Sequence, residues 1–528
     1  MSALSPHNQQ RDSLSRDVRR RQRLLTTAPC PGQEAEHDCC KADAQEPDGI
    51  PRFPTDVLPV SSQEEPPRHP NSSGVGGNSQ KAAPRFELGI KDLQSSALPL
   101  GHAADREASS PWRDRISRGS GALMVISNGH GEDLIALRVL EAIHRQRPSL
   151  ALEVLPLVGR GDVFKTAVSL GWLTRIGPEA TLPSGGFSNQ SLPALVADIK
   201  AGLAILSLRQ WRLVHRQAKR GRAMVAVGDL LPLLMAWSSG APFGFLGTPK
   251  SDYSWRSGPG RSLSDHYHRL KGSEWDPWEW MLMGSKRCRF VAVRDRLTAR
   301  GLRRHGIPAL APGNPMMDGL EVMPPPASLE RCRRIMLLCG SRMPEAQRNF
   351  QRLLAGVKRM ETHQPLALLM PVGRQPDSNA LGAELERHGF RFSLPPSDQL
   401  GAEACWVRGP CLLLIGRGCF NRWAGWAEVG IATAGTATEQ LVGLGVPTLS
   451  LPGPGPQFTG GFARRQSRLL GGSVRPCSST RELTEELCRL LNAPELRSRM
   501  GCTGQRRMGP AGGSSRLAQL ALSRLRGY

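Results

Sequence analysis

Short apolar runs and amphipathic stretches alternate along the chain from residue 121 onward. Each apolar run is long enough for one buried strand, and helical periodicity follows most of them. The runs are "ALMVIS", "LEVLPLVG", "AMVAVGD", "APFGFLG" and "RFVAVRD", and helices are expected at 133–146, 162–171, 230–238 and 296–305. Strands that alternate with helices are typical of a parallel sheet covered by helices. The pattern therefore predicts a doubly wound domain over residues 121–322.

A proline-rich segment, "EVMPPPASLE" at 321–330, interrupts this alternation, because three consecutive prolines fit neither a helix interior nor a central strand. The alternation then starts again with "RIMLLCGSR", "LALLMPVG", "CLLLIGRG", "VGIATAG" and "PTLSLPG", with helices expected near 344–360, 379–388, 420–428 and from 437. We expect a second doubly wound domain at 323–500 and a helical tail at 501–528. Ligands bind beyond the carboxyl ends of such strands, so two such domains predict an α/β fold with an interdomain cleft.

Residues 1–120 differ in composition from the rest of the chain. They are rich in Pro, Ser, Gly and charged residues and lack periodic apolar positions, so we expect a disordered extension. The stretch "RDVRRRQRLL" suggests a targeting extension, although the 16 acidic residues of this segment argue against an ordinary transit peptide. A wrongly assigned start codon is the alternative. The segment has no apolar core of the kind found in signal peptides.

The net charge of +23 belongs to the folded part of the chain, because residues 1–120 hold equal numbers of basic and acidic side chains. A basic body suggests an anionic partner, such as nucleotide phosphates or an anionic membrane face, or else a solvated arginine-rich surface. No nucleic-acid-binding motif is present, and 3 Tyr and 13 Phe leave few rings for base stacking. We therefore expect no nucleic-acid partner.

The 12 cysteines form no CxxC pair and have no histidine at zinc spacing, which favours a reducing compartment and no metal site. No stretch approaches the 18 or more uncharged apolar residues of a transmembrane helix. We expect a cytoplasmic protein that can lie peripherally on the inner face of a membrane.

The loop "SNGHGED" follows the first expected strand and leads into a helix. Its glycines permit backbone angles that other residues resist, and the helix start offers free amides and a positive dipole end for an anion. A simple helix cap is the alternative, but a cap needs one polar side chain and this loop offers four. A dinucleotide-binding fingerprint fits poorly, because Leu134 stands where the third glycine belongs. The candidate site residues are Asn128, Gly129, His130, Gly131, Glu132 and Asp133.

Two stretches of the second domain carry similar chemistry. In "LLCGSRMPEA", Gly340 and Ser341 can approach a phosphate and Arg342 can pair with it, unless Arg342 is a surface residue in a turn. In "ATAGTATEQ", a strand ends at Gly435 and a helix begins, and polar side chains near a helix start suit ribose hydroxyls. The alternative is helix capping with an acidic residue favourable to the dipole. The candidates from this stretch and the loop after it are Thr436, Thr438, Glu439, Gln440, Gln457 and Gln466.

Five stretches of the chain, within roughly residues 121–520, resemble motifs of a known family and follow in the same order. "AGTATEQLVGLGVP" resembles the donor-site pattern SGTATLEaaL-x-G-x-P of lipid-A-disaccharide synthase, and "LLCGSRMPE" resembles its LPGSR-x-x-E. "APGNPMMDGL" resembles its VGHP-x-x-D, with Asn314 in place of a histidine. "SNGHGEDLIA" stands in the place of its GE-x-SGD loop, where Asp133 matches an aspartate, and "AVGDLLPLL" in the place of IDxPDF, which makes Asp229 a candidate.

The chain resembles the lipid-A-disaccharide synthase-related group of cyanobacteria, and its loops also resemble the peptidoglycan N-acetylglucosaminyltransferase. The resemblance implies a GT-B glycosyltransferase that uses a UDP-sugar, of the N-acetylhexosamine type, as its donor substrate, with no metal or other cofactor. The Gly340 turn, Arg342 and the helix after Gly435 would stabilise the diphosphate leaving group. Glu439 or Gln440 would bind ribose; alignment back from "GVP" puts Gln440 at the family's glutamate position.

The first domain would bind the acceptor, a lipid or cell-envelope molecule, with His130 or Asp133 as general base. Trp255, Trp275, Trp278 and Trp280 would form a membrane-facing patch, unless they pack inside the domain. Two other functions remain open. One is a UDP-N-acetylglucosamine 2-epimerase-like enzyme, although no carboxylate pair is evident in the sequence. The other is a binding protein that has lost catalysis, which the glutamine and asparagine replacements favour.

Overall fold

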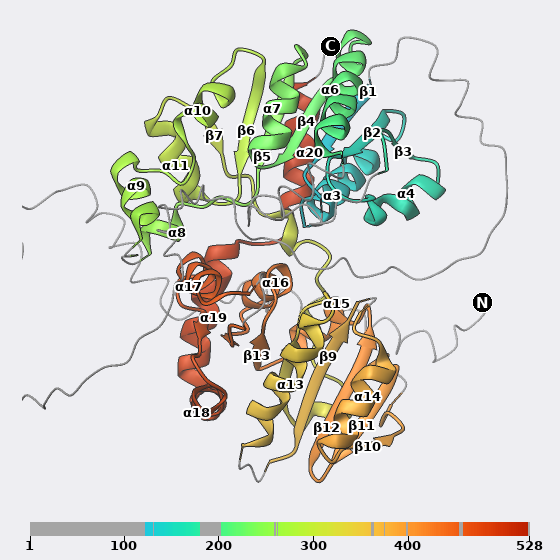
Figure 1. The fold of residues 1–528 in the computed structure, drawn as a ribbon, viewed down its shortest axis with the longest axis vertical. Helices are drawn as coiled ribbons and strands as arrows, with labels where there is room; N and C mark the ends of the chain where they lie inside the picture. Colours follow the sequence, from blue (N-terminus) through green and yellow to red (C-terminus); the bar gives the residue numbers. More distant parts are fainter. Residues whose placement is uncertain are drawn as a thin grey trace, which may run out of the picture. The chain divides into compact units, whose positions relative to one another are not determined.

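The computed structural model describes residues 122–129, 131–179, 202–257, 260, 262–360, 364–373, 375–397, 400–453 and 458–525. All of them belong to one compact unit of the chain, residues 87–528. The expectations for residues 1–120, for His130 and for Gln457 fall outside the described residues. Figure 1 shows the described elements, which build two sheets with helices on their faces.

The first sheet has seven parallel strands in the order β3-β2-β1-β4-β5-β6-β7. The chain adds β2 and β3 on one side of β1 and then returns to add β4 to β7 on the other side. The carboxyl ends of β1 and β4 are therefore the switch point of this sheet, where ligands bind in doubly wound folds. The strands are β1 (Ala122–Ser127), β2 (Ala151–Pro156), β3 (Leu173–Arg175), β4 (Ala223–Gly228), β5 (Phe243–Gly247), β6 (Cys288–Val293) and β7 (Ala309–Leu310).

The central strands β1 and β4 are buried at every position, as their uninterrupted apolar sequences require when helices cover both faces. The sheet separates two hydrophobic clusters, one on each of its faces, and the helices cover both. The helices are α3 (Gly131–Gln146), α4 (Lys165–Ser169), α6 (Leu203–Lys219), α7 (Leu230–Ser238), α8 (Tyr253–Arg256), α9 (Leu263–Lys271), α10 (Pro277–Met283) and α11 (Arg296–Arg304), with short 3₁₀ turns η2 (Asp162–Phe164) and η4 (Pro315–Met317).

The second sheet has eight strands in the order β10-β11-β12-β9-β8-β13-β14-β15. Its switch point lies between β8 and β13, because the chain builds outward from β8 in one direction and then in the other. The hairpin strands β10 and β11 are antiparallel to their neighbours, and the other pairs are parallel. The strands are β8 (Arg333–Leu338), β9 (Leu366–Val372), β10 (Arg391–Ser393), β11 (Ala404–Arg408), β12 (Cys411–Arg417), β13 (Val429–Ala432), β14 (Thr448–Ser450) and β15 (Val474–Pro476).

Residues 320–326, which cover the three prolines, contain no helix or strand, as the sequence predicts. The helices after this connection are α12 (Ala327–Glu330), α13 (Glu345–Lys358), α14 (Ser378–Arg387), α15 (Phe420–Trp423) with the 3₁₀ turn η6 (Ala424–Trp426), α16 (Thr436–Gly443), α17 (Gly460–Leu469), α18 (Thr480–Asn492), α19 (Pro494–Met508) and α20 (Gly513–Arg524). The expected architecture of two doubly wound, Rossmann-like domains is confirmed.

The last helix, α20, does not stay with the second sheet. It packs against α3 of the first sheet, and its Leu517, Ala518 and Ala521 join the same hydrophobic cluster as α3. Figure 1 shows α20 in red among the blue and green elements of the first sheet. Asp318 fixes the turn before the helix, because its carboxylate accepts hydrogen bonds from the amides of Gly512 and Ser514. The chain therefore finishes the first domain with its final residues.

Candidate functional site

The switch point of the first sheet brings together two sequence-predicted residues from distant parts of the chain. Asn128 follows β1 and Asp229 follows β4, and Nδ2 of Asn128 donates a hydrogen bond of 2.9 Å to Oδ1 of Asp229. Asp229 also caps α7 by accepting from the amide of Leu231 at 3.2 Å. Burial raises the pKa of Asp229, and these hydrogen bonds oppose that effect. Oδ1 of Asn128 is buried and accepts no hydrogen bond from the described residues.

Asp133 fixes the turn between β1 and α3. Its Oδ1 accepts a hydrogen bond of 2.5 Å from the Ser127 hydroxyl and one of 3.2 Å from the Gly129 amide. Burial raises the pKa of Asp133 to about 7 in spite of these donors. Gly129 has φ +97, and a Cβ there would lie 2.9 Å from the carbonyl oxygen of Val158. The turn therefore needs glycine at this position.

Glu132 lies beside the other two acids. It is buried, and its Cγ would be 3.3 Å from a Cβ on Gly228, the last residue of β4. Burial raises the pKa of Glu132 well above its usual range, and the charges of Asp229, Asp133 and Glu439 raise it further. Burial and three neighbouring carboxylates therefore favour the protonated form of Glu132. Gly131, the first residue of α3, is buried in the same turn.

The switch point of the second sheet brings together the two predicted glycine turns. Thr433, after β13, donates from its amide to the carbonyl of Leu338 at the end of β8, at 2.8 Å, and its hydroxyl donates to the same oxygen at 3.2 Å. Gly340 follows with φ +85. One pocket at this point is lined by Gly340, Ser341, Arg342, Glu345, Asn349 and Phe458, among others. A second is lined by Gly340, Ser341, Pro371, Phe420, Ala437 and Gln440, among others.

The start of α16 faces this switch point. The N-cap residue of the helix is Gly435, which has no side chain that could form a cap. Thr436 is buried, and its Oγ1 has no hydrogen-bond partner among the described residues. Thr438 differs, because its hydroxyl donates to the carbonyl of Ala434 at 2.7 Å. A helix start with a buried hydroxyl that has no partner among the described residues is suited to an anion.

The two candidates for ribose contact point in different directions. Glu439 is fully buried and accepts from Nη2 of Arg294 at 2.7 Å. Burial raises the pKa of Glu439, and Arg294 opposes that effect. Gln440 instead lines the pocket at Gly340, while its Nε2 donates to the carbonyl of Met316 at 2.8 Å. Of the two, Gln440 is the residue at the pocket.

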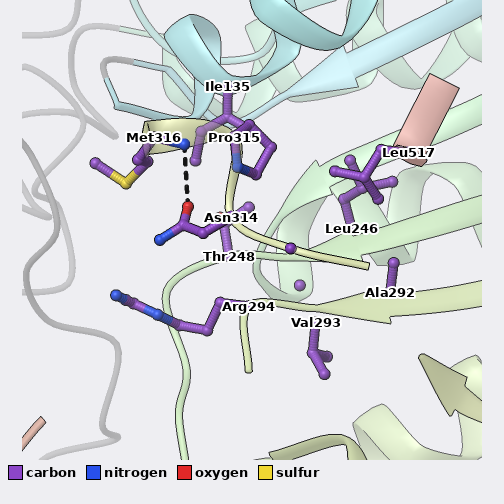
Figure 2. Close-up of a pocket in the computed structure, with 12 residues that line it drawn as sticks. Ile135, Leu246, Thr248, Ala292, Val293, Arg294, Asn314, Pro315, Met316 and Leu517 are labelled. Carbon is purple, nitrogen blue, oxygen red and sulfur yellow. Dashed lines mark hydrogen bonds between the residues drawn. The ribbon is translucent and has the colours of Figure 1, made fainter. Parts of the chain in front are cut away.

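Asn314 and Gln466 each hold a nearby backbone turn in place through a hydrogen bond. Oδ1 of Asn314 accepts from the amide of Met316 at 3.1 Å and caps the turn η4. Figure 2 shows this bond in a pocket whose walls include apolar side chains such as Ile135 and Leu517. Nε2 of Gln466 donates to the carbonyl of Gly435 at 3.2 Å, so Gln466 holds the turn before α16.

The four tryptophans of the expected membrane patch do not share one surface. Trp275 is fully buried in the core and packs edge-on against Phe245. Trp280 is partly buried and stacks on His305, and Trp255 is half-buried. Trp278 alone among the four is exposed. The alternative reading, in which these rings pack inside, holds for Trp275.

Arg294 is a site residue that sequence reasoning did not single out. Its one signal is its position directly after the apolar run "RFVAV", at the carboxyl end of β6. Within the described ranges, no group of three or more His, Cys, Asp or Glu side chains could hold a metal ion. No helix among the described residues is long and apolar enough to cross a membrane.

The sequence matches no protein-family model and none of the curated proteins. Among solved structures, 279 chains match. UGT71G1 from Medicago truncatula, complexed with UDP-glucose, is 12% identical over 77% of this chain and 99% of its own, with a TM-score of 0.50. A putative UDP-N-acetylglucosamine 2-epimerase from Listeria monocytogenes is 12% identical over 77% and 96%, with a TM-score of 0.47. MurG from Acinetobacter baumannii is 13% identical over 77% and 100%, with a TM-score of 0.46.

At such identities the likeness concerns the fold. Two doubly wound sheets, each with its polar turns at the switch point, define the GT-B class that the sequence predicts.

Proposed function

We propose that the protein is a glycosyltransferase that moves a sugar, of the N-acetylhexosamine type, from a UDP-sugar to a lipid or cell-envelope acceptor without a metal ion. The observation that carries the proposal is the switch point between β8 and β13. There the Gly340–Ser341 turn and two residues of α16, Ala437 and Gln440, line neighbouring pockets. The buried Thr436 hydroxyl, which has no partner among the described residues, belongs to the first turn of the same helix. These features support an anion site in a doubly wound domain.

The donor diphosphate would lie at the start of α16. Charge develops on the leaving diphosphate during sugar transfer, and fixed amide donors with a positive helix end stabilise that charge without reorganising. Arg342, which lines the pocket beside Gly340, would add a charge-assisted hydrogen bond. Gln440, which lines the neighbouring pocket, would contact the ribose with its amide oxygen.

The acceptor hydroxyl would lose its proton at the first switch point. Asp133 suits this step, because a base with a pKa of about 7 is half ionised at neutral pH. Both of its hydrogen bonds reach Oδ1, so Oδ2 is the atom that would take the proton. Glu132 would lie beside it as a second buried acid with a raised pKa. Asn128 would accept a hydrogen bond from the substrate through its Oδ1, and His130 is the alternative base.

The resemblance to lipid-A-disaccharide synthase supports a lipid or envelope acceptor and a protein at the cytoplasmic face of a membrane. UGT71G1, whose crystal structure contains UDP-glucose, is a protein of the same fold that binds a UDP-sugar.

One observation favours a second candidate function, a UDP-N-acetylglucosamine 2-epimerase-like activity. No carboxylate pair is evident in the sequence, yet the fold gathers Glu132, Asp133 and Asp229 at one switch point. Buried acids with raised pKa values can supply and remove protons on a bound sugar. A binding protein without catalysis is the third candidate.

The test is to incubate the purified chain with UDP-sugars, with and without a membrane lipid extract. UDP release that depends on the extract supports the transferase. A new free UDP-sugar isomer without added lipid supports the epimerase, and binding with neither product supports the binding protein. If no UDP-sugar binds, the donor site at α16 is wrong.

A further inference from the structure

Helices α6 and α7 are neighbours, and both expose large apolar side chains. Ile205, Leu208 and Trp211 on α6 are 60%, 45% and 40% exposed, and Leu231 and Leu234 on α7 are 37% and 43% exposed. The two helices pack against each other, and Figure 1 shows them side by side in green. Each set repeats every three residues, which places its members along one side of a helix. Apolar side chains gathered in this way mark an interaction surface.

The same surface is strongly basic. Besides its apolar side chains, α6 exposes four cationic residues and contains no acidic residue, and α7 contains no charged residue. None of the four forms an ion pair within the described part of the chain. They are Arg209, Arg212, Arg216 and Lys219. An amphipathic helix that combines exposed Trp, Leu and Ile with Arg and Lys is typical of helices that lie in the headgroup region of an anionic bilayer.

The surface also continues into the candidate acceptor site. Helix α7 begins directly after Asp229, whose carboxylate caps it by accepting from the amide of Leu231. Leu231 is therefore both an exposed apolar residue and a neighbour of the buried acids. A lipid held at α7 would have its headgroup close to the carboxyl ends of β1 and β4.

We propose that the α6–α7 surface docks on an anionic phospholipid bilayer, with its apolar side chains in the acyl boundary and its arginines and lysine among the lipid phosphates. The role of this docking rests on the proposed function, because the bilayer would present a lipid-borne hydroxyl to the first switch point. The binding itself needs no sugar donor. It replaces the tryptophan patch expected from the sequence, whose rings do not share one face.

The test is sedimentation of the full chain with vesicles of phosphatidylcholine mixed with phosphatidylglycerol, against phosphatidylcholine alone. We expect binding to the anionic vesicles that weakens as salt is added. Each basic residue near such a surface is worth about five-fold in affinity. The double variant Arg209→Gln/Arg212→Gln should therefore bind roughly 30-fold more weakly. Leu208→Ser/Trp211→Ser should weaken binding to the same vesicles at high salt, where the apolar contribution remains.

Matched controls come from exposed residues elsewhere. Leu263→Ser/Leu270→Ser removes two side chains on α9 that are 88% and 89% exposed, and Arg481→Gln/Arg489→Gln removes two exposed charges on α18. Both should bind vesicles as the parent protein does. All four double variants change exposed side chains, so circular dichroism and the Tm should confirm that each is folded.

Three results would overturn the proposal: no binding to anionic vesicles, equal loss in the α9 or α18 controls, or a dimer in light scattering that the α6 variants dissolve. The transferase assay with a soluble donor and detergent-dispersed lipid is read separately. If vesicle binding fails but UDP is released, the docking surface is wrong and the proposed function is unaffected. If vesicles bind but no UDP is released, the proposed function is wrong and the docking surface is unaffected.

Discussion

Thr436 and Thr438 lie two residues apart in α16 and use their hydroxyls differently, which gives a direct test of the anion site. Thr436→Val removes a buried hydroxyl that has no hydrogen-bond partner among the described residues, at almost constant volume. If that hydroxyl contacts the donor diphosphate, UDP-sugar binding should weaken about ten-fold or more, because a bond to a charged acceptor is lost. Isothermal titration with the UDP-sugar measures the change, and the Tm should not fall.

The control is Thr438→Val in the same helix. Its hydroxyl already donates to the carbonyl of Ala434, so the variant should lose about 1 kcal/mol of stability and keep its donor affinity. If both variants lose affinity equally, or Thr436→Val binds normally, the donor phosphates do not lie at the start of α16.

Asp133 makes stability depend on pH in a direction opposite to that of an ordinary surface carboxylate. Its folded pKa of about 7 lies above the value of 3.8 that it has when exposed, so the folded state holds the proton more tightly. The tighter binding of this proton adds roughly 4 kcal/mol to the free energy of unfolding below about pH 4, and this stabilisation is lost as pH rises to about 7.

Asp133→Asn isolates this effect, because an amide oxygen can accept the same two hydrogen bonds without a charge. We expect the free energies of unfolding of parent and variant to diverge as pH rises from about 4 to 7, with the variant the more stable at pH 8. Urea unfolding at several pH values measures the difference. Parallel curves would contradict a raised pKa, and unchanged turnover in the variant would exclude Asp133 as the base.

At the scale of elements, the turn between β1 and α3 can be tested through its glycine. Gly129→Ala places a Cβ 2.9 Å from the carbonyl oxygen of Val158 at φ +97, whereas Gly159, at φ +78, has nothing within 4 Å of its added Cβ. Gly159→Ala should therefore cost about 1–2 kcal/mol for its backbone alone. Gly129→Ala should cost more and should also lower turnover, because the turn carries Asn128 and the buried acids. Equal losses of stability would show that the turn adapts.

The elements that the sequence predicted well are the fully buried ones. The runs "ALMVIS" and "AMVAVG" are apolar at every position, so their assignment as β1 and β4 needed no knowledge of neighbours. The hairpin strand "RFS" was missed because Arg391 and Phe392 are exposed and its pairing is antiparallel. Helices α9 and α10 were also missed, although each begins with a capping box, at Ser262 and Asp276, that the sequence contains.

The site was predictable in outline for a related reason. Polar turns after buried strands can be read from one sequence, and parallel pairing brings the turns of neighbouring strands together. The partner of each side chain could not be read in this way. Glu439 and Gln440 are adjacent, yet Glu439 pairs with Arg294 and Gln440 lines the pocket, because neighbouring residues of a helix point in different directions. Such choices depend on contacts more than a hundred residues away.

At the scale of the whole molecule, the Arg294–Glu439 pair joins the end of β6 in the first sheet to α16 in the second. Both side chains are buried, so removing one charge leaves the other unpaired. Arg294→Met should destabilise the protein by about 3–5 kcal/mol, and the double variant Arg294→Met/Glu439→Leu should recover much of that loss. Urea denaturation of both single variants and the double variant measures the coupling. If the stability losses of the two single variants add up in the double variant, the two side chains have no interaction energy with each other.

The return of α20 to the first sheet has a consequence for the order of synthesis. The strands of the first sheet leave the ribosome before the second domain is made, but the cluster on one face of that sheet lacks Leu517, Ala518 and Ala521 until the last helix emerges. At ordinary elongation rates that interval is about 10 to 40 seconds. During it, α3 already packs on the strands of the sheet, but the side of it that later contacts α20 stays uncovered, so the nascent chain exposes apolar surface until its C-terminus is made.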